Sequence, residues 1–309
     1  MKLLTRRSAL GAALAAAGIG ALEYAKLRGT FDHARLAPPV GRERFAQSRA
    51  DLASSTDLAD GALVHVGHST HLLSVAGVRF LTDPWFYDPA FGALSHARGP
   101  ATLPENVGDL DCLLITHDHA DHADMRAIDR LDKRAQAIVA TDELAVQVRN
   151  LGFKEIHVLR PWDILAVGRA KVMAVPAEHD VYEVGYVLEG AGRRVYFAGD
   201  TRLFDGIDAI AERMKPTMAI LPVDGTRVRT GGLHVMTPAD AVAAAVKLGA
   251  RMVMPSHAEA YFSDPFAKYA LATLIEGAGG IFARAMATAL PDVRCVVPDA
   301  GDLVAIPKG

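Results

Sequence analysis

Short runs of apolar residues, each closed by glycine, proline or polar residues, recur along the chain from residue 62 onward. Runs of this length that are rich in valine, leucine and isoleucine are typical of β-strands. Several are apolar at consecutive positions, as expected for strands covered on both faces by other layers. The pattern predicts strands over residues 62–66, 71–75, 78–82, 111–116, 155–159, 172–175, 184–188, 194–198, 218–221, 251–255 and 293–297.

Two segments, 144–150 and 238–248, have alanine, valine and leucine at helical spacing. The second is preceded by Thr237 and contains Pro238 and Asp240 in its first turn, which is typical of a helix start. Strands come first along the chain, and strands mixed with helices follow in two halves. This order predicts an α/β protein with a four-layer αββα sandwich.

The N-terminus differs from the rest of the chain. Lys2, Arg6 and Arg7 precede an uncharged stretch, residues 8–22, that consists largely of alanine, glycine and leucine. A membrane span needs about 20 apolar residues, so this stretch is short for a span and fits an export signal. The arginine pair resembles a twin-arginine export motif, and an ordinary signal or an uncleaved anchor is the alternative.

We therefore expect three parts: an export signal or anchor over residues 1–30, a polar linker over 31–60, and a folded domain over 61–309. The protein is expected to be exported, either to the periplasm or anchored to the membrane and facing it. Membrane association would then occur through the N-terminus.

The overall composition restricts the partners. The chain has 309 residues, of which 50% are hydrophobic and 22% charged, which suits one large or two small globular domains. A net charge of -3 and the lack of a basic run in the body argue against a nucleic-acid partner. Cys112 and Cys295 lie in apolar runs, where cysteine usually behaves as a small buried hydrophobe. The sequence leaves the oligomeric state open.

A dense group of potential metal ligands follows the apolar run 112–115: His117, His119, Asp121 and His122. Residues two apart in an extended segment point the same way, so His117 and His119 can approach one ion. Asp121 and His122 then suit a neighbouring site. Histidines mixed with carboxylates, without cysteine, indicate a catalytic centre rather than a closed structural site.

A solvated polar loop is the alternative interpretation of this run. The run directly follows a strand that is expected to be buried. Histidine and aspartate are costly to bury without partners, which favours a metal centre.

The pattern His117-x-His119-x-Asp121-His122 resembles the signature of the metallo-β-lactamase superfamily. The remaining motifs of that family are present in the expected order, at Asp83, His179, Asp200 and His257. The resemblance covers about residues 62 to 260. It implies one metal ion held by His117, His119, His179 and Asp200, and a second held by Asp121, His122, Asp200 and His257.

Three segments, 66–70, 77–86 and 234–241, are similar to the branch that contains L-ascorbate-6-phosphate lactonase and N-acyl-phosphatidylethanolamine phospholipase D. In the phospholipase a His-Met segment lies near the substrate, which makes His234 the candidate substrate-facing histidine. Residues 223–230 depart from the phospholipase pattern, so a phospholipid substrate stays open.

The resemblance implies a hydrolase with two divalent metal ions. Zinc is expected first, with manganese or iron as alternatives, because histidine and aspartate accept all three. A hydroxide that bridges the ions is expected to cleave an ester, lactone or phosphodiester bond in a small molecule, a lipid or a sugar phosphate. Asp200, Asp121 and His234 are the candidate catalytic residues.

Five further residues are candidates for supporting roles. Asp83 and Asp124 are expected to accept hydrogen bonds from ligand histidines. Arg227 and Arg229 are candidates to bind an anionic group of the substrate, with a solvated surface loop as the alternative. His68 follows a strand end and either lines the site or has a structural role.

Other functions on the same fold are less favoured. Iron-dependent oxidoreductases of this fold tend to have a carboxylate where this chain has His119, and no flavin-binding segment is evident. The charge and the export signal disfavour an RNA-processing nuclease. A complete ligand set disfavours a non-catalytic binding protein. A β-lactamase is disfavoured because those enzymes generally have a cysteine or another ligand arrangement where Asp200 stands.

Overall fold

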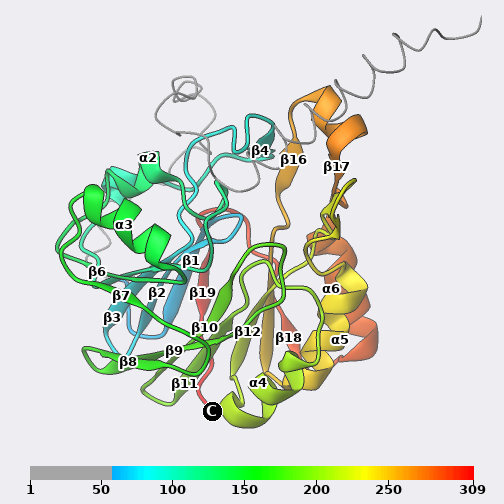
Figure 1. Ribbon diagram of the computed structural model, residues 1–309. Coiled ribbons are helices and arrows are strands. Elements are labelled where there is room, and N and C mark those ends of the chain that lie inside the picture. The colour runs from blue at the N-terminus through cyan, green and yellow to red at the C-terminus, as the bar shows by residue number, and fades with distance from the viewer. Residues whose placement is uncertain (1–57) are drawn as a thin grey trace, which may run out of the picture.

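The computed structural model describes residues 58–309 of the chain (Figure 1). The expected export signal or anchor and nearly all of the linker lie outside the described residues. Within 58–309, no helix combines the length and the hydropathy that crossing a membrane requires.

The first of two seven-stranded sheets has the strand order β19-β1-β2-β3-β5-β6-β7. Strands β1 to β3 pair antiparallel, whereas β3, β5, β6 and β7 are parallel. The strands of this sheet are β1 (Ala62–Gly67), β2 (Thr70–Val75), β3 (Val78–Thr82), β5 (Cys112–Ile115), β6 (Gln136–Val139), β7 (Ile156–Val158) and β19 (Leu303–Ala305).

The second sheet has the order β18-β15-β12-β11-β10-β9-β8. It repeats the same plan, since β8 to β11 pair antiparallel and β11, β12, β15 and β18 are parallel. The strands are β8 (Ile164–Val167), β9 (Ala170–Pro176), β10 (Val184–Gly190), β11 (Arg193–Phe197), β12 (Met218–Pro222), β15 (Met252–Ser256) and β18 (Arg294–Cys295).

Helices cover the outer face of each sheet, and short strands rise above the sheets in Figure 1. The helices are α2 (Met125–Ile128), α3 (Asp142–Asn150), α4 (Gly206–Met214), α5 (Pro238–Leu248) and α6 (Ala278–Ala289), with short turns η5 (Pro104–Asn106) and η6 (Ala267–Leu271). The short strands are β4 (Leu94–His96), β13 (Arg227–Val228), β14 (Gly232–Leu233), β16 (Ala260–Phe262) and β17 (Ala272–Thr273).

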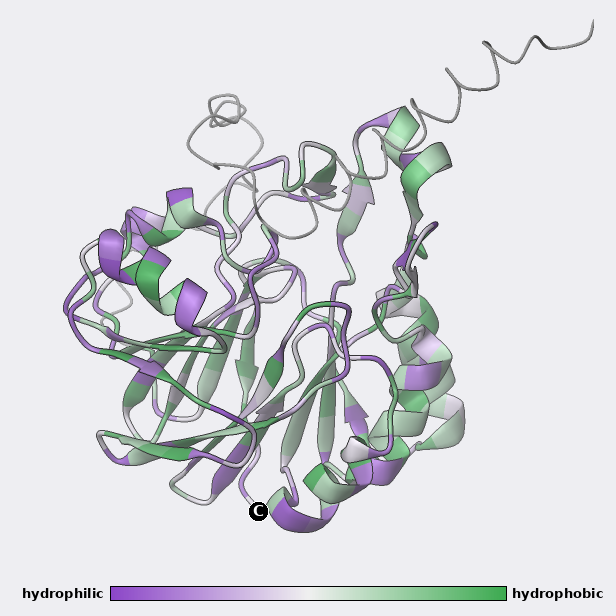
Figure 2. Ribbon diagram, viewed as in Figure 1, coloured by the Kyte–Doolittle hydropathy of each residue, from purple (hydrophilic) through white to green (hydrophobic). Residues whose placement is uncertain are grey.

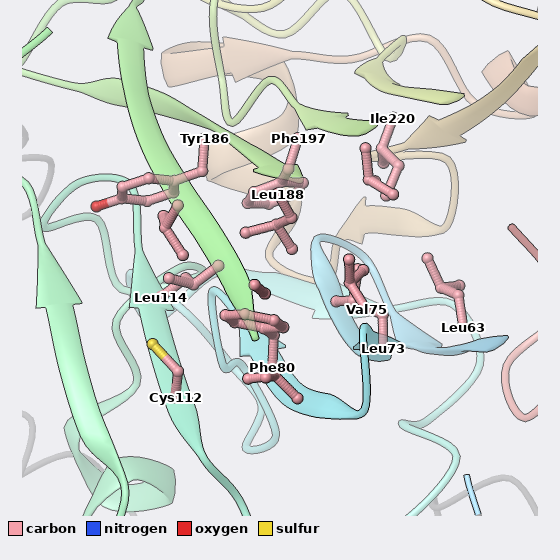
Figure 3. Packing of buried hydrophobic residues seen from close by; sticks show 14 of the residues in the cluster. Leu63, Leu73, Val75, Phe80, Cys112, Leu114, Tyr186, Leu188, Phe197 and Ile220 are labelled. Carbon is pink, nitrogen blue, oxygen red and sulfur yellow. The ribbon is translucent and has the colours of Figure 1, made fainter. Parts of the chain in front are cut away.

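Three apolar cores hold the layers together. The middle core lies between the two sheets and includes Phe80, Leu114, Tyr186, Leu188 and Phe197, all at most 1% exposed (Figure 3). A second core joins the first sheet to α2 and α3, and a third joins the second sheet to α4, α5 and α6. Burial of each large apolar side chain stabilises the fold by about 1.5–3 kcal/mol. The predicted αββα sandwich is confirmed, and green strands fill its interior in Figure 2.

The apolar pattern placed the central strands within one or two residues of their observed bounds. Strands β5, β12 and β15 are buried at every position, as predicted for strands covered on both faces. The helix at 238–248 begins with a capping box between Thr237 and Asp240. The pattern missed α2, α4, α6, β6, β8, β19 and the short strands. Helix α6 contains Gly279 and Gly280, which weaken a helical signal, and its stability comes from packing.

Candidate metal centre

The site lies at one edge of the two sheets because the strands that lead into it run in the same direction within each sheet. Strands β3 and β5 are parallel, as are β11, β12 and β15. The carboxyl ends of parallel strands meet at one edge, where ligand sites of α/β sheets form. The residues delivered there are His68 after β1, Asp83 after β3, His117 after β5, His179 after β9, Asp200 after β11, Asp224 after β12 and His257 after β15.

The first set of converging donor atoms belongs to His117, His119, His179 and Asp200. One ligand atom from each lies within 4.8 Å of the others. Nε2 of His179 is 3.2 Å from Nδ1 of His119, and Nε2 of His117 is 3.9 Å from an oxygen of Asp200. The structure thus brings together the residues that the resemblance assigned to one ion.

The second set contains His68, Asp121, His122 and His257, again with donor atoms within 4.8 Å of one another. Oδ1 of Asp200 lies 3.1 Å from Nε2 of His122 and 2.5 Å from Nε2 of His257. Asp200 therefore contacts members of both sets. The residues that the resemblance assigned to the second ion therefore lie close together, and His68 lies among them.

Carboxylates and a hydroxyl orient the histidine rings of the chain segment after β5. Asp83 accepts hydrogen bonds from the backbone N of Thr116 at 2.8 Å and from Nδ1 of His122 at 2.7 Å. Nδ1 of His117 lies 2.9 Å from Oγ1 of Thr116 and 3.2 Å from Oε1 of Glu183. Such contacts fix the tautomer and direct Nε2 of each ring toward the donor set.

The rings of His179 and His257 are held in the same way. Nδ1 of His179 donates to the carbonyl oxygen of His234 at 3.1 Å. Nδ1 of His257 is 3.6 Å from Oδ2 of Asp224. Nε2 of His257 then faces Asp200 of the donor set, and Nε2 of His179 faces both His119 and Asp180.

Asp124 does not act as predicted. It accepts hydrogen bonds from the backbone N of Tyr87 at 3.0 Å and from Arg126, and it caps the N-terminus of α2. The physical reason is its position at a helix start, where an aspartate side chain accepts hydrogen bonds from backbone N–H groups that have no partner within the helix. Of the two predicted carboxylates, only Asp83 accepts a hydrogen bond from a candidate ligand histidine, His122.

Sequence analysis missed Asp180, Glu183 and Asp224. Asp180 lies 3.0 Å from Nε2 of His179 and 3.3 Å from Nδ1 of His234. Glu183 is buried and accepts the backbone N–H of Asp200 at 2.7 Å. For Glu183 before β10 and Asp224 after β12, the available signal was an acidic residue beside an apolar strand, whereas Asp180 lies in the loop between β9 and β10 and has no such signal.

Three histidines favour the protonated form in the metal-free protein. Burial opposes their protonation, but neighbouring carboxylates outweigh it. Asp200 raises the pKa of His257 to about 10, and Asp200 and Asp121 raise that of His122 well above its usual range. Asp180 and Glu183 raise the pKa of His179 to about 9.

Other groups are shifted in the opposite sense. Burial, together with His122 and His179, lowers the pKa of His117 to about 3. Burial raises the pKa of Glu183 to about 7, so this carboxyl titrates near neutral pH. The metal-free site is thus a network of ion pairs and neutral groups.

The donor sets fit metal ions. Nε2 of His117 and Oδ1 of Asp121 are buried and have no hydrogen-bond partner among residues 58–309. Leaving such groups unpartnered costs about 1–3 kcal/mol each. Imidazole and carboxylate donors that converge without partners are the ligands that zinc, manganese and iron accept.

A cavity of about 350 Å³ opens onto these donors. Its polar lining comes from His119, Asp121, His179, Asp200 and His257 of the donor sets, together with Asp224, Thr226, His234 and Asp264. The rest of the wall is mainly apolar and includes Phe91, Leu94, Val228, Val235, Phe262, Phe266 and Leu271. His234 therefore lies where a substrate-facing histidine was expected.

Arg227 and Arg229 do not line this cavity, contrary to the prediction that they bind an anionic group there. Both side chains are exposed, whereas Thr226 and Val228 of the same segment line the cavity. Side chains of an extended segment alternate between two faces, so the arginines lie on the face away from the cavity. No arginine or lysine of the described chain lines it.

The turn after β11 leaves no room for a side chain at Gly199. A Cβ added there would lie 2.0 Å from Oε1 of Glu183, and the residue has a φ of +67°. We expect Gly199→Ala to destabilise the metal-free protein by about 1–3 kcal/mol and to weaken metal binding, since Glu183 holds Asp200. Thermal melting and metal titration measure both effects.

Gly192→Ala is the matched control, because Gly192 has a φ of +77° and open space around its Cβ position. It adds the same backbone strain without the clash. Equal losses of stability and unchanged metal binding in the two variants would contradict the role given to Gly199 and Glu183.

Known proteins resemble this chain in sequence and in fold. Residues 78–258 match the sequence model of a protein family, the beta-lactamase superfamily domain. A UPF0173 metal-dependent hydrolase from Caldivirga maquilingensis is 31% identical over 202 residues, 64% of this chain and 82% of that protein. Igni18, a metallo hydrolase from Ignicoccus hospitalis, superposes with a TM-score of 0.61 at 25% identity, over 79% of this chain and 97% of that one.

The fold also occurs in CmlA, a diiron β-hydroxylase from Streptomyces venezuelae, with a TM-score of 0.52 at 21% identity over 64% of this chain and 45% of that chain. The matched domain contains Asp83 and every expected ligand from His117 to His257, and it begins after His68. The chain belongs to the metallo-β-lactamase superfamily, together with relatives named metal-dependent hydrolases.

Proposed function

We propose that this protein is a two-metal hydrolase that cleaves an ester-type bond in a substrate with an apolar group. The observation that carries the proposal is the pair of donor sets that share Asp200 beside an apolar cavity. His117, His119, His179 and Asp200 would hold one ion. Asp121, His122, His257 and Asp200 would hold the other.

Bound divalent ions supply Lewis acidity and an acidified water in such a centre. The protein's own groups do the remaining work. Asp200 lies between the two donor sets and contacts members of both, and Asp83 fixes His122 through Nδ1. The wall of the cavity is mainly apolar, and surroundings of low polarity strengthen the electrostatic interactions of the donors beside it.

His234 is suited to give a proton to the leaving group. It is 4% exposed, lines the cavity, and its Nε2 has no hydrogen-bond partner among the described residues. Nδ1 lies 3.3 Å from Oδ1 of Asp180, which would hold the ring in place. A positioned histidine of this kind contributes about 10²–10⁴-fold to a rate.

The wall of the cavity favours a neutral, apolar substrate group over a sugar phosphate. Recognition of phosphate usually employs arginine or lysine, and neither lines the cavity within the described chain. Phe91, Phe262, Phe266 and Leu271 offer apolar contact instead. The apolar wall therefore favours a substrate with a lipid-like group.

A series of p-nitrophenyl esters of increasing acyl length tests the substrate class. Each buried methylene is worth about 0.8 kcal/mol, so kcat/KM is expected to rise roughly fourfold per methylene until the cavity is filled. Phosphorylated sugars are expected to be poor substrates. A flat ester series with efficient cleavage of a sugar phosphate would overturn this assignment.

An iron-dependent oxidoreductase is the competing function, because the fold is shared with a diiron hydroxylase. Metal analysis of protein purified without added metal, combined with an oxygen-consumption assay, separates the two. Oxygen uptake that requires bound iron, without hydrolysis of any ester, would replace the hydrolase proposal.

A further inference from the structure

His68 occupies a strained turn between β1 and β2. Its φ is +54°, in the left-handed region that few residues other than glycine adopt. Its backbone N donates to Oε2 of Glu259 at 3.0 Å, and the other oxygen of Glu259 contacts Nε2 of His65. Glu259 lies two residues after His257, which also has a positive φ of +56°. One carboxylate therefore ties the turn of His68 to the loop of a proposed ligand.

The ring of His68 faces the second donor set. Its centroid lies 3.7 Å from that of His257, and its Nε2 lies 3.4 Å from Oδ2 of Asp121. The edge of Trp85 covers it at 4.9 Å. The ring of His68 therefore lies between two proposed metal ligands, His257 and Asp121, and the aromatic side chain of Trp85.

Neither ring nitrogen of His68 has a hydrogen-bond partner among the described residues, although the residue is only 1% exposed. Buried polar groups without partners are rare, and each requires an explanation. Strained backbone conformations cluster where a function requires them. A ligand that binds a ring nitrogen of His68 would explain both the unpartnered nitrogens and the strained backbone.

We propose that His68 is an additional protein ligand of the second metal ion, together with Asp121, His122, His257 and Asp200. The inference rests on the proposed two-metal site and goes beyond it, because the resemblance assigns His68 to neither ion, whereas the structure places it among the second donor set. It makes the two sites unequal. The second ion has one more protein donor than the first, so the first is the one with room for substrate.

The variant His68→Asn tests the proposal. Asparagine tolerates the left-handed conformation but is too short to replace the imidazole. We expect the affinity for the second equivalent of Zn²⁺ to fall at least about tenfold, with the first unchanged. Competition with a chelator measures both steps, and the visible spectrum of the Co²⁺-loaded protein reports the loss of a nitrogen ligand.

His96→Asn is the matched control. His96 is also a buried histidine, stacked on Trp85 at 3.7 Å, but its Nδ1 is paired with Asp88 and it belongs to neither donor set. It is expected to keep both metal affinities and the Co²⁺ spectrum, even if its melting temperature falls. A lower melting temperature alone is what a structural role would produce in either variant.

Unchanged second-site affinity and an unchanged Co²⁺ spectrum in His68→Asn would overturn the inference and leave the two-metal proposal standing. A wild-type protein that binds no second ion would overturn the two-metal proposal itself. If His68→Asn does not fold, crystals of the Zn²⁺-loaded wild type decide. The inference requires an anomalous peak about 2.0–2.1 Å from a ring nitrogen of His68, and a peak out of bonding reach overturns it.

Discussion

Replacing Asp200 with alanine is expected to remove both metal ions and to lower kcat/KM on the order of a thousandfold or more. Asp200 contacts His122 and His257 of one donor set and belongs to the other with His117. Its loss takes the shared ligand from both sites at once. It also leaves His122 and His257 facing each other, with Nε2 atoms 3.0 Å apart and the carboxylate gone.

Elemental analysis after dialysis and an ester assay measure these effects. Asp205→Ala is the control, because Asp205 is an exposed carboxylate before α4 whose side chain makes no capping hydrogen bond. The control is expected to keep two equivalents of metal and full activity. Two equivalents of metal in the Asp200 variant would show that Asp200 does not bridge the sites.

Metal binding at about pH 7.5 is expected to release about two to three protons per protein. In the metal-free protein, His257 with a pKa of about 10, His179 with a pKa of about 9 and His122 with a raised pKa carry protons at this pH. Each must lose its proton before its Nε2 can bind a metal ion. Calorimetry in buffers of different ionisation enthalpy counts the protons.

The same shifts set the direction of the pH dependence. Metal affinity is expected to rise with pH up to about 9 to 10, as protons compete less. The stability of the metal-free protein changes in the opposite direction. The raised pKa values of His257 and His179 stabilise it fully below an unfolded pKa of about 6.5, and this stabilisation is lost as pH rises through about 9 and 10.

Thermal melting of metal-free protein between pH 7 and pH 10.5 checks this sign. A melting temperature that rises with pH, or metal binding without proton release, would contradict protonated histidines in the metal-free site. The control is the metal-loaded protein, whose histidines are already deprotonated. Its melting temperature is expected to be less dependent on pH in this range.

The sequence was sufficient for the central strands and for the ligand order, because both are local patterns. Apolar runs such as 112–115 and 252–256 mark buried strands regardless of their neighbours. Supporting groups are different. Glu183 meets Asp200 only because β10 and β11 pair as a hairpin, and Asp180 meets His234 across 54 positions of chain, from 180 to 234.

The error at Arg227 has a simple physical origin. The prediction assumed that Arg227 and Arg229 lie in a loop, where a charged side chain can turn toward the site. Once β13 is known to be a strand, alternation places Val228 on the cavity side and Arg227 on the other. His68 is a related case, because its proximity to His257 depends on two turns held together by Glu259.

The central claim is that two metal ions are held on either side of Asp200. An anomalous difference map from crystals of the zinc-loaded protein, collected above and below the zinc edge, tests it most directly. The account predicts two peaks that both lie in bonding contact with Asp200, one beside His117, His119 and His179 and the other beside Asp121, His122 and His257. A single peak, or two peaks that do not share Asp200, would contradict it.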